Sequence, residues 1–302
     1  MKVVITGSQG QVGLELQKQL KGDKNIQLYP LSSGDLDIVN KEQAEETLYM
    51  LNPEVVINCA AYTAVDLCEE EQEKAYNVNV VGPYNLATVC EEIGAKLVHI
   101  STDYVFSGAF NLERSHAIQD GNILEIRQKM AKYSRPWKEN DPINPQNIYG
   151  LTKWQGEEEV GKHCTKHFII RTAWLYGEGN NFVRTMLKLA ETNKELNVVA
   201  DQFGNPTYAK DLARAIVDLM QTEHYGTYHG TCEGTCSWYD FAKKIFEIKG
   251  IDIHVNPVTS EEFLRPAKRP FYSSLDNFML KLHGMNTFRT WEEALEDYLS
   301  NE

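Results

Sequence analysis

Up to about residue 170, the chain alternates between continuous apolar runs and segments whose apolar residues recur at helical spacing. Continuous apolar runs are typical of strands buried on both faces of a parallel sheet. They predict strands at residues 2–6, 26–31, 53–61, 96–102 and 168–171. Helical spacing between them predicts helices at residues 14–20, 43–51 and 71–93. This alternation predicts an α/β protein built on a parallel sheet.

The remaining chain predicts shorter elements of the same two kinds. We expect helices at residues 182–190, 211–220, 238–248 and 291–299, and strands at 197–199 and 226–229. Between Phe106 and Tyr149 the chain is polar, with a helical patch at residues 123–131 that is followed by prolines at 136, 142 and 145. A connection this long within a compact unit is usually functional.

The composition is that of a globular protein of 302 residues, with 42% hydrophobic and 24% charged residues. The formal net charge is −13 and no dense Lys/Arg cluster appears, which argues against nucleic acid or an anionic membrane as a partner. No segment approaches the ~18 apolar residues of a membrane span, and the start of the chain does not resemble a signal peptide. The six cysteines form no C-x-x-C pair, so we expect reduced thiols and a cytoplasmic protein.

Three evenly spaced glycines follow the first predicted strand. Gly7 and Gly10 would allow a tight turn and a close backbone approach to a pyrophosphate, while Gly13 would let the next helix lie against the strand. The helix N-terminus, beginning near Gln11 and Val12, would then face the phosphates. The spacing G-x-x-G-x-x-G in a strand–turn–helix context therefore predicts a dinucleotide site.

The end of the second predicted strand bears on the choice of cofactor. Dinucleotide folds often place an acidic residue there to bind the adenosine ribose, but residues 28–33 contain none. The missing acid removes an obstacle to the 2′-phosphate, so we expect NADPH, with NADH tolerated. Asp37 and Ile38 follow and could flank the adenine, or Asp37 could instead cap a helix.

Tyr149 and Lys153 are four residues apart, a spacing that places both side chains on one face of a helix. An ammonium one turn away would favour the phenolate and lower the tyrosine pKa, which makes the pair a candidate general acid for a carbonyl under reduction. Tyr-x-x-x-Lys alone is a weak signal. Thr102 adds to it, because it ends a predicted strand at the edge where doubly wound sheets bind ligands.

The predicted helix at 71–93 carries two asparagines, Asn77 and Asn79. We expect both to face outward, although Asn79 could instead order the end of the sheet.

Six stretches together carry a resemblance to a known family: Gly7–Gly13, Val56–Asp66, Ser101–Phe106, Tyr149–Lys153, Arg171–Tyr176 and Asp201–Thr207. The chain resembles the extended short-chain dehydrogenase/reductase superfamily and, within it, the dTDP-4-dehydrorhamnose reductase family. The Ser-Thr-Asp-Tyr-Val-Phe and Asp-Gln-x-Gly-x-Pro-Thr stretches are the specific ones. Arg269-Pro270 extends the resemblance toward the C-terminus.

The resemblance implies a Rossmann-like doubly wound parallel sheet with a smaller C-terminal α/β substrate-binding domain. The dinucleotide-binding domain would comprise residues 1–172 and 206–230, and the substrate-binding domain residues 173–205 and 231–302. The implied reaction is reduction by NAD(P)H of the C4 ketone of a nucleotide-linked deoxysugar, most closely dTDP-4-dehydro-L-rhamnose to dTDP-L-rhamnose. The nucleotide sugar would be the binding partner, and a homodimer is left open.

The resemblance also implies roles for individual side chains. Tyr149 would protonate the developing alkoxide, Lys153 would hold the nicotinamide ribose, and Thr102 would donate a hydrogen bond to the carbonyl oxygen. The implied cofactor contacts are Gly7, Gly10, Gln11, Val12, Gly13, Asp37, Ile38, Ala61, Tyr62, Thr63, Asn79, Tyr149 and Lys153. The implied substrate contacts are Thr102, Asp103, Tyr104, Trp174 and Arg269, although Trp174 could belong to the core and Arg269 could be an exposed, solubilising residue.

Departures from the family pattern leave other functions open. Thr102 and Tyr149 are 47 residues apart (149 − 102), and the excess lies in an inserted segment at about residues 109–137. The alternatives are a nucleotide-sugar epimerase or dehydratase, and a non-catalytic NADP-binding regulatory subunit.

No metal ligand set is predicted: His163-Cys164-x-x-His167 lacks a second ligand pair. Magnesium through a carboxylate such as Glu15 is left open.

Overall fold

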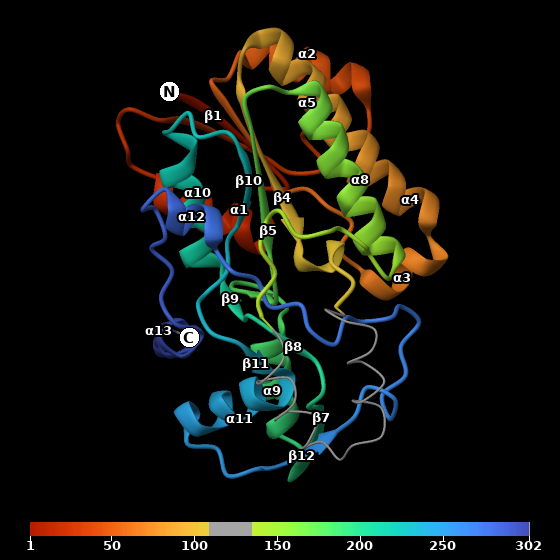
Figure 1. Cartoon of the computed structure of the whole chain (residues 1–302). Helices are drawn as coiled ribbons and strands as arrows, with labels where there is room; N and C mark the ends of the chain where they lie inside the picture. Colours follow the sequence, from red (N-terminus) through yellow and green to blue (C-terminus); the bar gives the residue numbers. More distant parts are fainter. Residues whose placement is uncertain (109–134, 302) are drawn as a thin grey trace.

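The computed structural model describes residues 1–108 and 135–301, and it confirms the α/β class. Within that part of the chain, six parallel strands form one sheet in the order β10-β5-β4-β3-β1-β2 (Figure 1). Their bounds are β1 Lys2–Thr6, β2 Gln27–Leu31, β3 Val55–Asn58, β4 Lys96–Thr102, β5 His167–Thr172 and β10 Gly226–His229. The chain order reverses between β1 and β3, so the sheet is doubly wound, and the predicted strands are confirmed with shifts of a few residues.

Helices cover both faces of the sheet (Figure 1). On one face lie α1 (Gln11–Leu20) and α10 (Ala209–Met220), which contact each other. On the other lie α2 (Lys41–Leu51), α5 (Gly82–Ile93) and α8 (Ile148–His163), packed in that order. Strand β1 shows why both layers form, because Val3 and Ile5 belong to one hydrophobic core while Val4 belongs to the other.

The predicted helix at 71–93 is interrupted, and the expectation that Asn79 faces outward is wrong. Helix α3 (Val65–Glu70) precedes it, followed by α4 (Gln72–Tyr76), a π-helical turn η1 (Asn77–Val81) and α5. Asn79 lies within η1 and is fully buried. π-turns of this kind occur frequently at functional sites. The alternative expectation, that Asn79 orders the end of the sheet, is the one that the structure supports.

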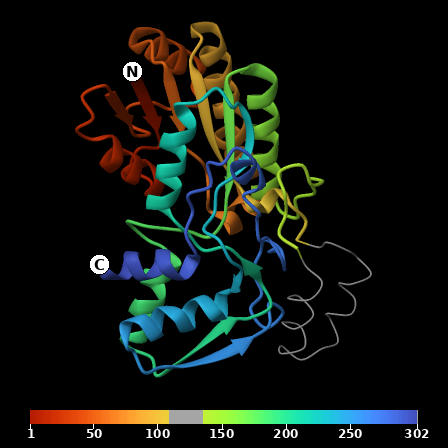
Figure 2. The same cartoon turned by 60° about the vertical axis from the view of Figure 1, so that its left-hand side comes forward.

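The C-terminal part builds a second layered unit below the main sheet (Figures 1 and 2). Its helices are α9 (Phe182–Ala190), α11 (Trp238–Lys249), α12 (Phe278–Leu282) and α13 (Trp291–Ser300). Its short strands are β6 Leu175–Tyr176, β7 Glu195–Val199, β8 Phe203–Gly204, β9 Thr207–Tyr208, β11 Cys236–Ser237 and β12 His254–Val258. The longer helices match the sequence predictions, whereas the paired strands β8 and β11 and the partner of β7, β12, were not predicted. The domain boundaries stay a prediction, and the helical patch at 123–131 lies outside the described residues.

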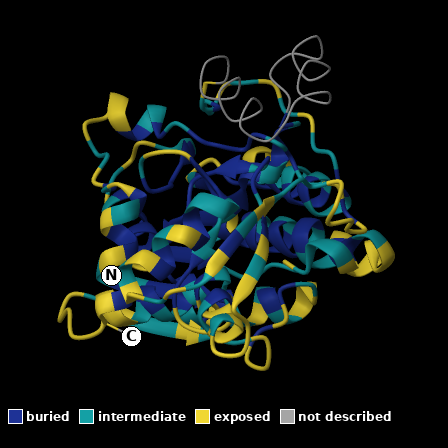
Figure 3. Cartoon of the chain, turned by 90° about the horizontal axis from the view of Figure 1, so that it is seen from below, coloured by how far each residue is buried: buried dark blue, intermediate teal, exposed yellow. Residues whose placement is uncertain are grey.

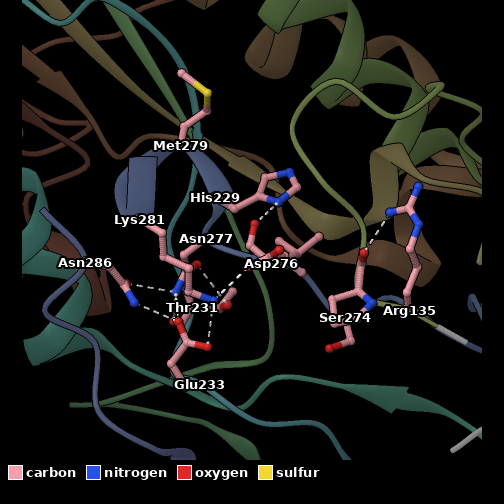
Figure 4. Close-up of polar contacts among 12 residues, drawn as sticks. Arg135, His229, Thr231, Glu233, Ser274, Asp276, Asn277, Met279, Lys281 and Asn286 are labelled. Atoms are coloured by element: carbon pink, nitrogen blue, oxygen red, sulfur yellow. Dashed lines mark hydrogen bonds and ion pairs between the residues drawn. The ribbon is translucent and has the colours of Figure 1, made fainter. Parts of the chain in front are cut away.

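Asn277 ties the segment after β10 to the C-terminal part (Figure 4). Its amide oxygen accepts the backbone N–H of Thr231 at 3.1 Å, and its amide nitrogen donates to the Thr231 carbonyl at 2.8 Å. The same nitrogen donates to Glu233, whose carboxylate also accepts from Asn286 and pairs with Lys281. Because Asn277 is buried, this satisfied network fixes how the C-terminal segment leaves the main sheet.

Buried polar residues gather where the strands end. Thr6, Asn58 and Thr102 close β1, β3 and β4 and are each at most 5% exposed. Buried residues fill the interior of the chain, and exposed ones lie around its outside (Figure 3). The carboxyl ends of parallel strands form the ligand edge of a doubly wound sheet, so these residues locate the candidate site.

Candidate active site

The turn between β1 and α1 needs glycine at two positions. Gly7 has a φ of +63°, and a Cβ placed there would lie 2.6 Å from the Ala60 nitrogen. A Cβ at Gly13 would lie 2.7 Å from both the Gly7 carbonyl oxygen and the Cα of Ser8. Glycine therefore lets the turn lie flat against the end of β3 and lets α1 begin close to β1, which is the expected strand–turn–helix geometry.

The first turn of α1 presents its backbone N–H groups without a side-chain cap. Gly10 is the N-cap residue and is exposed, while the Val12 side chain turns into the core. The Gln11 amide oxygen is buried and has no hydrogen-bond partner among the described residues. The uncapped N–H groups fit an anionic pyrophosphate at the helix N-terminus, near the backbone of residues 10–12, whereas the Gln11 oxygen is an acceptor and adds nothing to that fit.

Asp37 and Ile38 lie in the segment between β2 and α2, and the structure gives them different surroundings. The side chain of Asn40, and not that of Asp37, caps α2 by accepting the Gln43 N–H at 3.0 Å, so the helix-cap expectation for Asp37 is wrong. Asp37 is exposed and accepts the Val39 N–H at 3.0 Å. The Ile38 side chain is in the core against α5, and its carbonyl oxygen accepts a buried hydrogen bond from the Asn85 amide at 2.9 Å, so the expected contact of Ile38 with the adenosine stays a prediction.

Asn79 positions the strand-end segment Ala61–Thr63. Its amide oxygen accepts the Tyr62 N–H at 2.9 Å, and its nitrogen donates to the Tyr62 carbonyl at 3.2 Å and to the Thr152 hydroxyl at 3.2 Å. The two backbone bonds fix residue 62 as a neighbouring strand would. Ala61 and Tyr62 are partly exposed and Thr63 is exposed, so this segment lies at the surface of the ligand edge.

Two glycines bring α8 close to the sheet edge. A Cβ at Gly150 would lie 2.2 Å from the Tyr104 carbonyl oxygen, and one at Gly156 would lie 2.1 Å from the Asn79 carbonyl oxygen. Asn147 caps the helix by accepting the Gly150 N–H at 2.7 Å. The helix is therefore held against η1 and against the short turn η2 (Asp103–Val105), with Tyr149 directly before the first of these glycines and Lys153 between the two.

Tyr149 lies at the carboxyl end of β4, with its ring edge-on to Tyr104 at a centroid distance of 5.8 Å. Burial raises the pKa of Tyr149, and hydrogen bonding with Thr102 opposes that shift. The expectation of a lowered pKa is therefore wrong in this structure. The phenol is a protonated group at neutral pH, placed beside the strand-end threonine.

Lys153 is buried and its ammonium points into the end of the sheet. Nζ donates to the Ile100 carbonyl oxygen at 2.6 Å and lies 3.4 Å from Nε2 of His99. Burial lowers the pKa of Lys153 to about 8, although Glu157 and Cys59 act in the opposite direction. Nζ is directed toward Ile100 and His99 and not toward the Tyr149 phenol. Lys153 therefore does not counter the rise in the Tyr149 pKa that burial causes.

Thr102 and Asp103 form a buried pair beside Tyr149. The Thr102 hydroxyl donates to Oδ1 of Asp103 at 3.0 Å and accepts the Tyr104 N–H at 3.2 Å. Oδ2 of Asp103 is buried without a partner among the described residues. Burial raises the pKa of Asp103 to about 7, and hydrogen bonds from Ser273 and Thr102 limit that rise. This carboxyl group therefore changes charge near neutral pH.

Trp174 is partly exposed and stacks on Trp238, with ring centroids 3.5 Å apart and an interplanar angle of 6°. Its φ is +45°, a strained value for a residue with a large side chain. A Cβ at Gly204 would lie 2.6 Å from the indole, so β8 lies directly against the ring. Backbone strain held by such packing is common at binding sites.

Arg269 is not an exposed solubilising residue, because its side chain is only 15% exposed and makes a fork-like pair with Asp66. Its two terminal nitrogens donate to the two carboxylate oxygens at 2.6 and 3.0 Å. Asp66 also accepts from Arg265 and from the Ala267 N–H. The fork that would suit a diphosphate is engaged by Asp66 in this structure, so the substrate role of Arg269 stays a prediction.

No group of three or more metal-binding side chains lies together among the residues that the structure describes. Glu15 is buried and its carboxylate accepts from Lys18 at 2.7 Å. His163 instead lies 3.3 Å from Glu159, and His167 contacts the Cys164 carbonyl. Across the described ranges, no helix is both long enough and apolar enough to cross a bilayer.

Several residues of the site were not predicted. The glycines at 150 and 156, the acid Asp66 and the stacked Trp238 act through partners that are distant in the sequence. The spacing Gly150-x₅-Gly156 around Lys153 was the one readable signal, since glycine inside a helix usually has a packing reason.

The meeting of α8 with β4 and with the turn η2 that follows it, in a doubly wound sheet with a glycine turn after β1, is the arrangement of a short-chain dehydrogenase/reductase. The chain matches the family model "RmlD substrate binding domain" over residues 1–302. With this full-length match, the chain belongs to the dTDP-4-dehydrorhamnose reductase family.

Three relatives show how far the similarity extends. The chain is 42% identical over 299 residues to the spore coat polysaccharide biosynthesis protein SpsK of Bacillus subtilis, covering 99% of this chain and 96% of that protein. A solved dTDP-4-dehydrorhamnose reductase from Clostridium acetobutylicum superposes with a TM-score of 0.90 at 48% identity, covering 100% and 99% of the two chains. The corresponding Bacillus anthracis enzyme, solved in complex with NADP, gives 0.89 at 41% identity with the same coverage.

Proposed function

We propose that this chain reduces the C4 ketone of dTDP-4-dehydro-L-rhamnose to give dTDP-L-rhamnose, with NADPH as the preferred reductant. One observation carries the proposal: Thr102, Tyr149 and Lys153 meet at the ligand edge of the sheet, in a chain that aligns over its full length with reductases of this name. The similarity to the enzyme solved with NADP supports a nicotinamide cofactor. The preference for NADPH rests on the absence of an acid at the end of β2, where Ser32 and Ser33 follow Leu31.

Each side chain has a separate task in the proposed reaction. The bound nicotinamide supplies the hydride, and the protein orients it and supplies the proton. Tyr149 holds the proton that goes to the C4 oxygen, since its raised pKa keeps the phenol protonated until negative charge develops beside it. We assign to Lys153 the hydrogen bond to the nicotinamide ribose, and to the Thr102 hydroxyl a hydrogen bond to the same C4 oxygen.

The remaining predicted residues shape the two binding regions. The backbone of Gly10, Gln11 and Val12 at the start of α1 suits the pyrophosphate, and Asp37 is placed for the adenosine. The segment Ala61–Thr63, held by Asn79, lies along the cofactor. Trp174, Tyr104 and Asp103 face the sugar and its base, and Arg269 meets the diphosphate.

The test is NADPH oxidation followed on addition of dTDP-4-dehydro-L-rhamnose, with NADH assayed in parallel. We expect turnover with both cofactors and a higher kcat/KM for NADPH. Product analysis separates the reductase from an epimerase or dehydratase, since only a reductase consumes one NADPH for each sugar reduced. No oxidation with this sugar, at an enzyme concentration that binds NADPH, would refute the proposal.

Tyr149→Phe provides the matched control within the site. The variant keeps the ring that packs on Tyr104 but has no proton to give. We expect it to bind NADPH normally and to lose turnover by about 10²–10⁴-fold, the range for a lost general acid. Unchanged turnover would remove Tyr149 from the proton-donor role.

A further inference from the structure

A row of buried polar side chains crosses three neighbouring strands beneath the site. Thr6, Asn58 and His99 lie opposite one another in the register of β1, β3 and β4. All three are at most 1% exposed. The row ends at Lys153, whose Nζ lies 3.4 Å from Nε2 of His99. No part of the proposed reaction yet gives Asn58 or His99 a role.

The hydrogen bonds of Asn58 determine which way its amide points. Its Oδ1 accepts the Thr6 hydroxyl at 2.7 Å and the Ala60 backbone N–H at 3.1 Å. A backbone N–H can only donate, so the amide oxygen must lie on that side. The amide nitrogen therefore faces Nδ1 of His99, at 3.1 Å, and donates to it.

This assignment fixes the tautomer of His99. Burial, with Lys153 nearby, holds the pKa of His99 well below its usual range, so the ring is neutral and carries one proton. Nδ1 accepts from Asn58, so that proton is on Nε2. The Nε2–H then points at the Lys153 amine, and an ammonium there would place two donors face to face.

We propose that Asn58 locks His99 as the Nε2–H tautomer, and that this N–H makes His99 a positioning residue that favours the uncharged amine of Lys153. The inference rests on the proposed function only for its consequence, namely that Lys153 can exchange a proton near neutral pH. The distances agree with it, since Nζ makes its short bond of 2.6 Å to the Ile100 carbonyl and only the 3.4 Å contact to His99.

Burial lowers the pKa of Lys153, and none of its other titratable neighbours adds to that effect. Glu157, one turn along α8, would strengthen the ammonium, but its carboxylate is engaged by Arg171 from β5 at 2.7–3.1 Å. Cys59 follows β3, and burial raises its thiol pKa to about 12, which keeps it uncharged. Tyr149, on the same face of α8, is protonated. His99 is thus the neighbour whose orientation acts directly on Nζ.

The first test reads the tautomer itself, without turnover. Long-range ¹H–¹⁵N spectra of the histidine-labelled protein distinguish protonated from bare ring nitrogens, and loss of one signal set in His99→Gln assigns the residue. We expect Nε2 protonated and Nδ1 bare at neutral pH. A proton on Nδ1 would overturn the proposal.

The second test reverses the lock. Asn58→Asp can still accept from Thr6 and Ala60, but it requires a proton on Nδ1 and so turns Nε2 into an acceptor for Lys153. We expect the ¹³Cε titration midpoint of Lys153, assigned with Lys153→Met, to rise by about one pH unit or more. His99→Phe, which has no N–H, should shift it in the same direction, and an unchanged midpoint in both variants would overturn the proposal.

Thr6→Val is the matched control, because the Ala60 N–H still orients the Asn58 amide. It should leave both the His99 tautomer and the Lys153 midpoint unchanged, and a shift equal to that of Asn58→Asp would count against the lock. If the wild-type chain lacked turnover, the proposed function would fail while these spectra would still decide the tautomer.

Discussion

The Thr102 hydroxyl donates to the carboxylate of its own neighbour, Asp103, at 3.0 Å. A hydroxyl has a single proton, so Thr102 cannot donate to a substrate oxygen while it donates to Asp103. Charge on Asp103 strengthens the competing bond, because hydrogen bonds to an ionised acceptor are roughly twice as strong as neutral ones. The protonation state of Asp103 therefore sets how readily Thr102 can serve the reaction.

The first prediction concerns the pH profile. Since burial raises the pKa of Asp103 to about 7, the carboxyl is neutral below that pH and ionised above it. We expect the kcat/KM of the wild-type chain to decline as pH rises through about 7, and this limb to disappear in Asp103→Asn. Steady-state NADPH oxidation across pH checks it.

Ser273 supplies a control for that assignment. Its hydrogen bond lowers the pKa of Asp103, so Ser273→Ala should move the same limb to higher pH. A limb that stays in place in both variants would belong to another group.

The second prediction follows from the same shift and concerns stability. The pKa of Asp103 is about 7 in the fold and 3.8 in the unfolded chain. The preference of the fold for the protonated carboxyl is therefore fully present below pH 3.8 and is lost as pH rises to about 7. The cost of ionising Asp103 in the fold is on the order of several kcal/mol at about 1.4 kcal/mol per pKa unit. Asp103→Asn avoids that cost.

The stability of Asp103→Asn relative to wild type should therefore grow between about pH 4 and pH 7 and then level off. Urea unfolding at a series of pH values measures it. A relative stability that stays flat across this range would show that Asp103 is not strained by ionisation.

The residues that were predicted from the sequence are those whose signals are local. Continuous apolar runs identified the sheet strands, since burial on both faces demands them, and the spacing of Gly7, Gly10 and Gly13 identified the turn. The helix at 71–93 shows the limit. Its amphipathic pattern is real, but the π-turn at Asn77–Val81 depends on Asn79 reaching Tyr62 and Thr152.

Relationships between distant residues were beyond local patterns. Arg269 and Asp66 are 203 residues apart in the chain, and the sequence around either residue contains no signal that predicts their ion pair. The Asn58–His99 contact depends on the register of β3 against β4. The direction of the Tyr149 pKa was mistaken because the spacing to Lys153 says nothing of burial or of the bond between Nζ and the Ile100 carbonyl.

The third prediction uses two glycines of α8 that differ only in surroundings. Gly156→Ala places a methyl group 2.1 Å from the Asn79 carbonyl oxygen, so α8 must shift away from η1. We expect a loss of about 1–3 kcal/mol, as for other overpacked sites, together with weaker NADPH binding because Lys153 moves with the helix. Urea unfolding and cofactor titration check both parts.

Gly161→Ala is the matched control, since Gly161 is exposed and has nothing within 4 Å of an added Cβ. It should stabilise the chain by about 0.5–1 kcal/mol through helix propensity and leave cofactor affinity unchanged. Equal effects of the two substitutions would show that α8 does not need its close contact with η1.

The fourth prediction separates two arginines that share Asp66. The Arg269 side chain is 15% exposed and bonds Asp66 through both terminal nitrogens, whereas Arg265 is 51% exposed and makes one contact at 3.4 Å. Lysine keeps the charge but not the planar fork that matches a diphosphate.

We expect Arg269→Lys to raise the KM for the nucleotide sugar about tenfold, equivalent to about 1.4 kcal/mol, with little change in kcat. Arg265→Lys should change neither by more than about twofold. Steady-state kinetics at saturating NADPH measure both variants, and a larger effect at Arg265 would place the diphosphate against the exposed arginine instead.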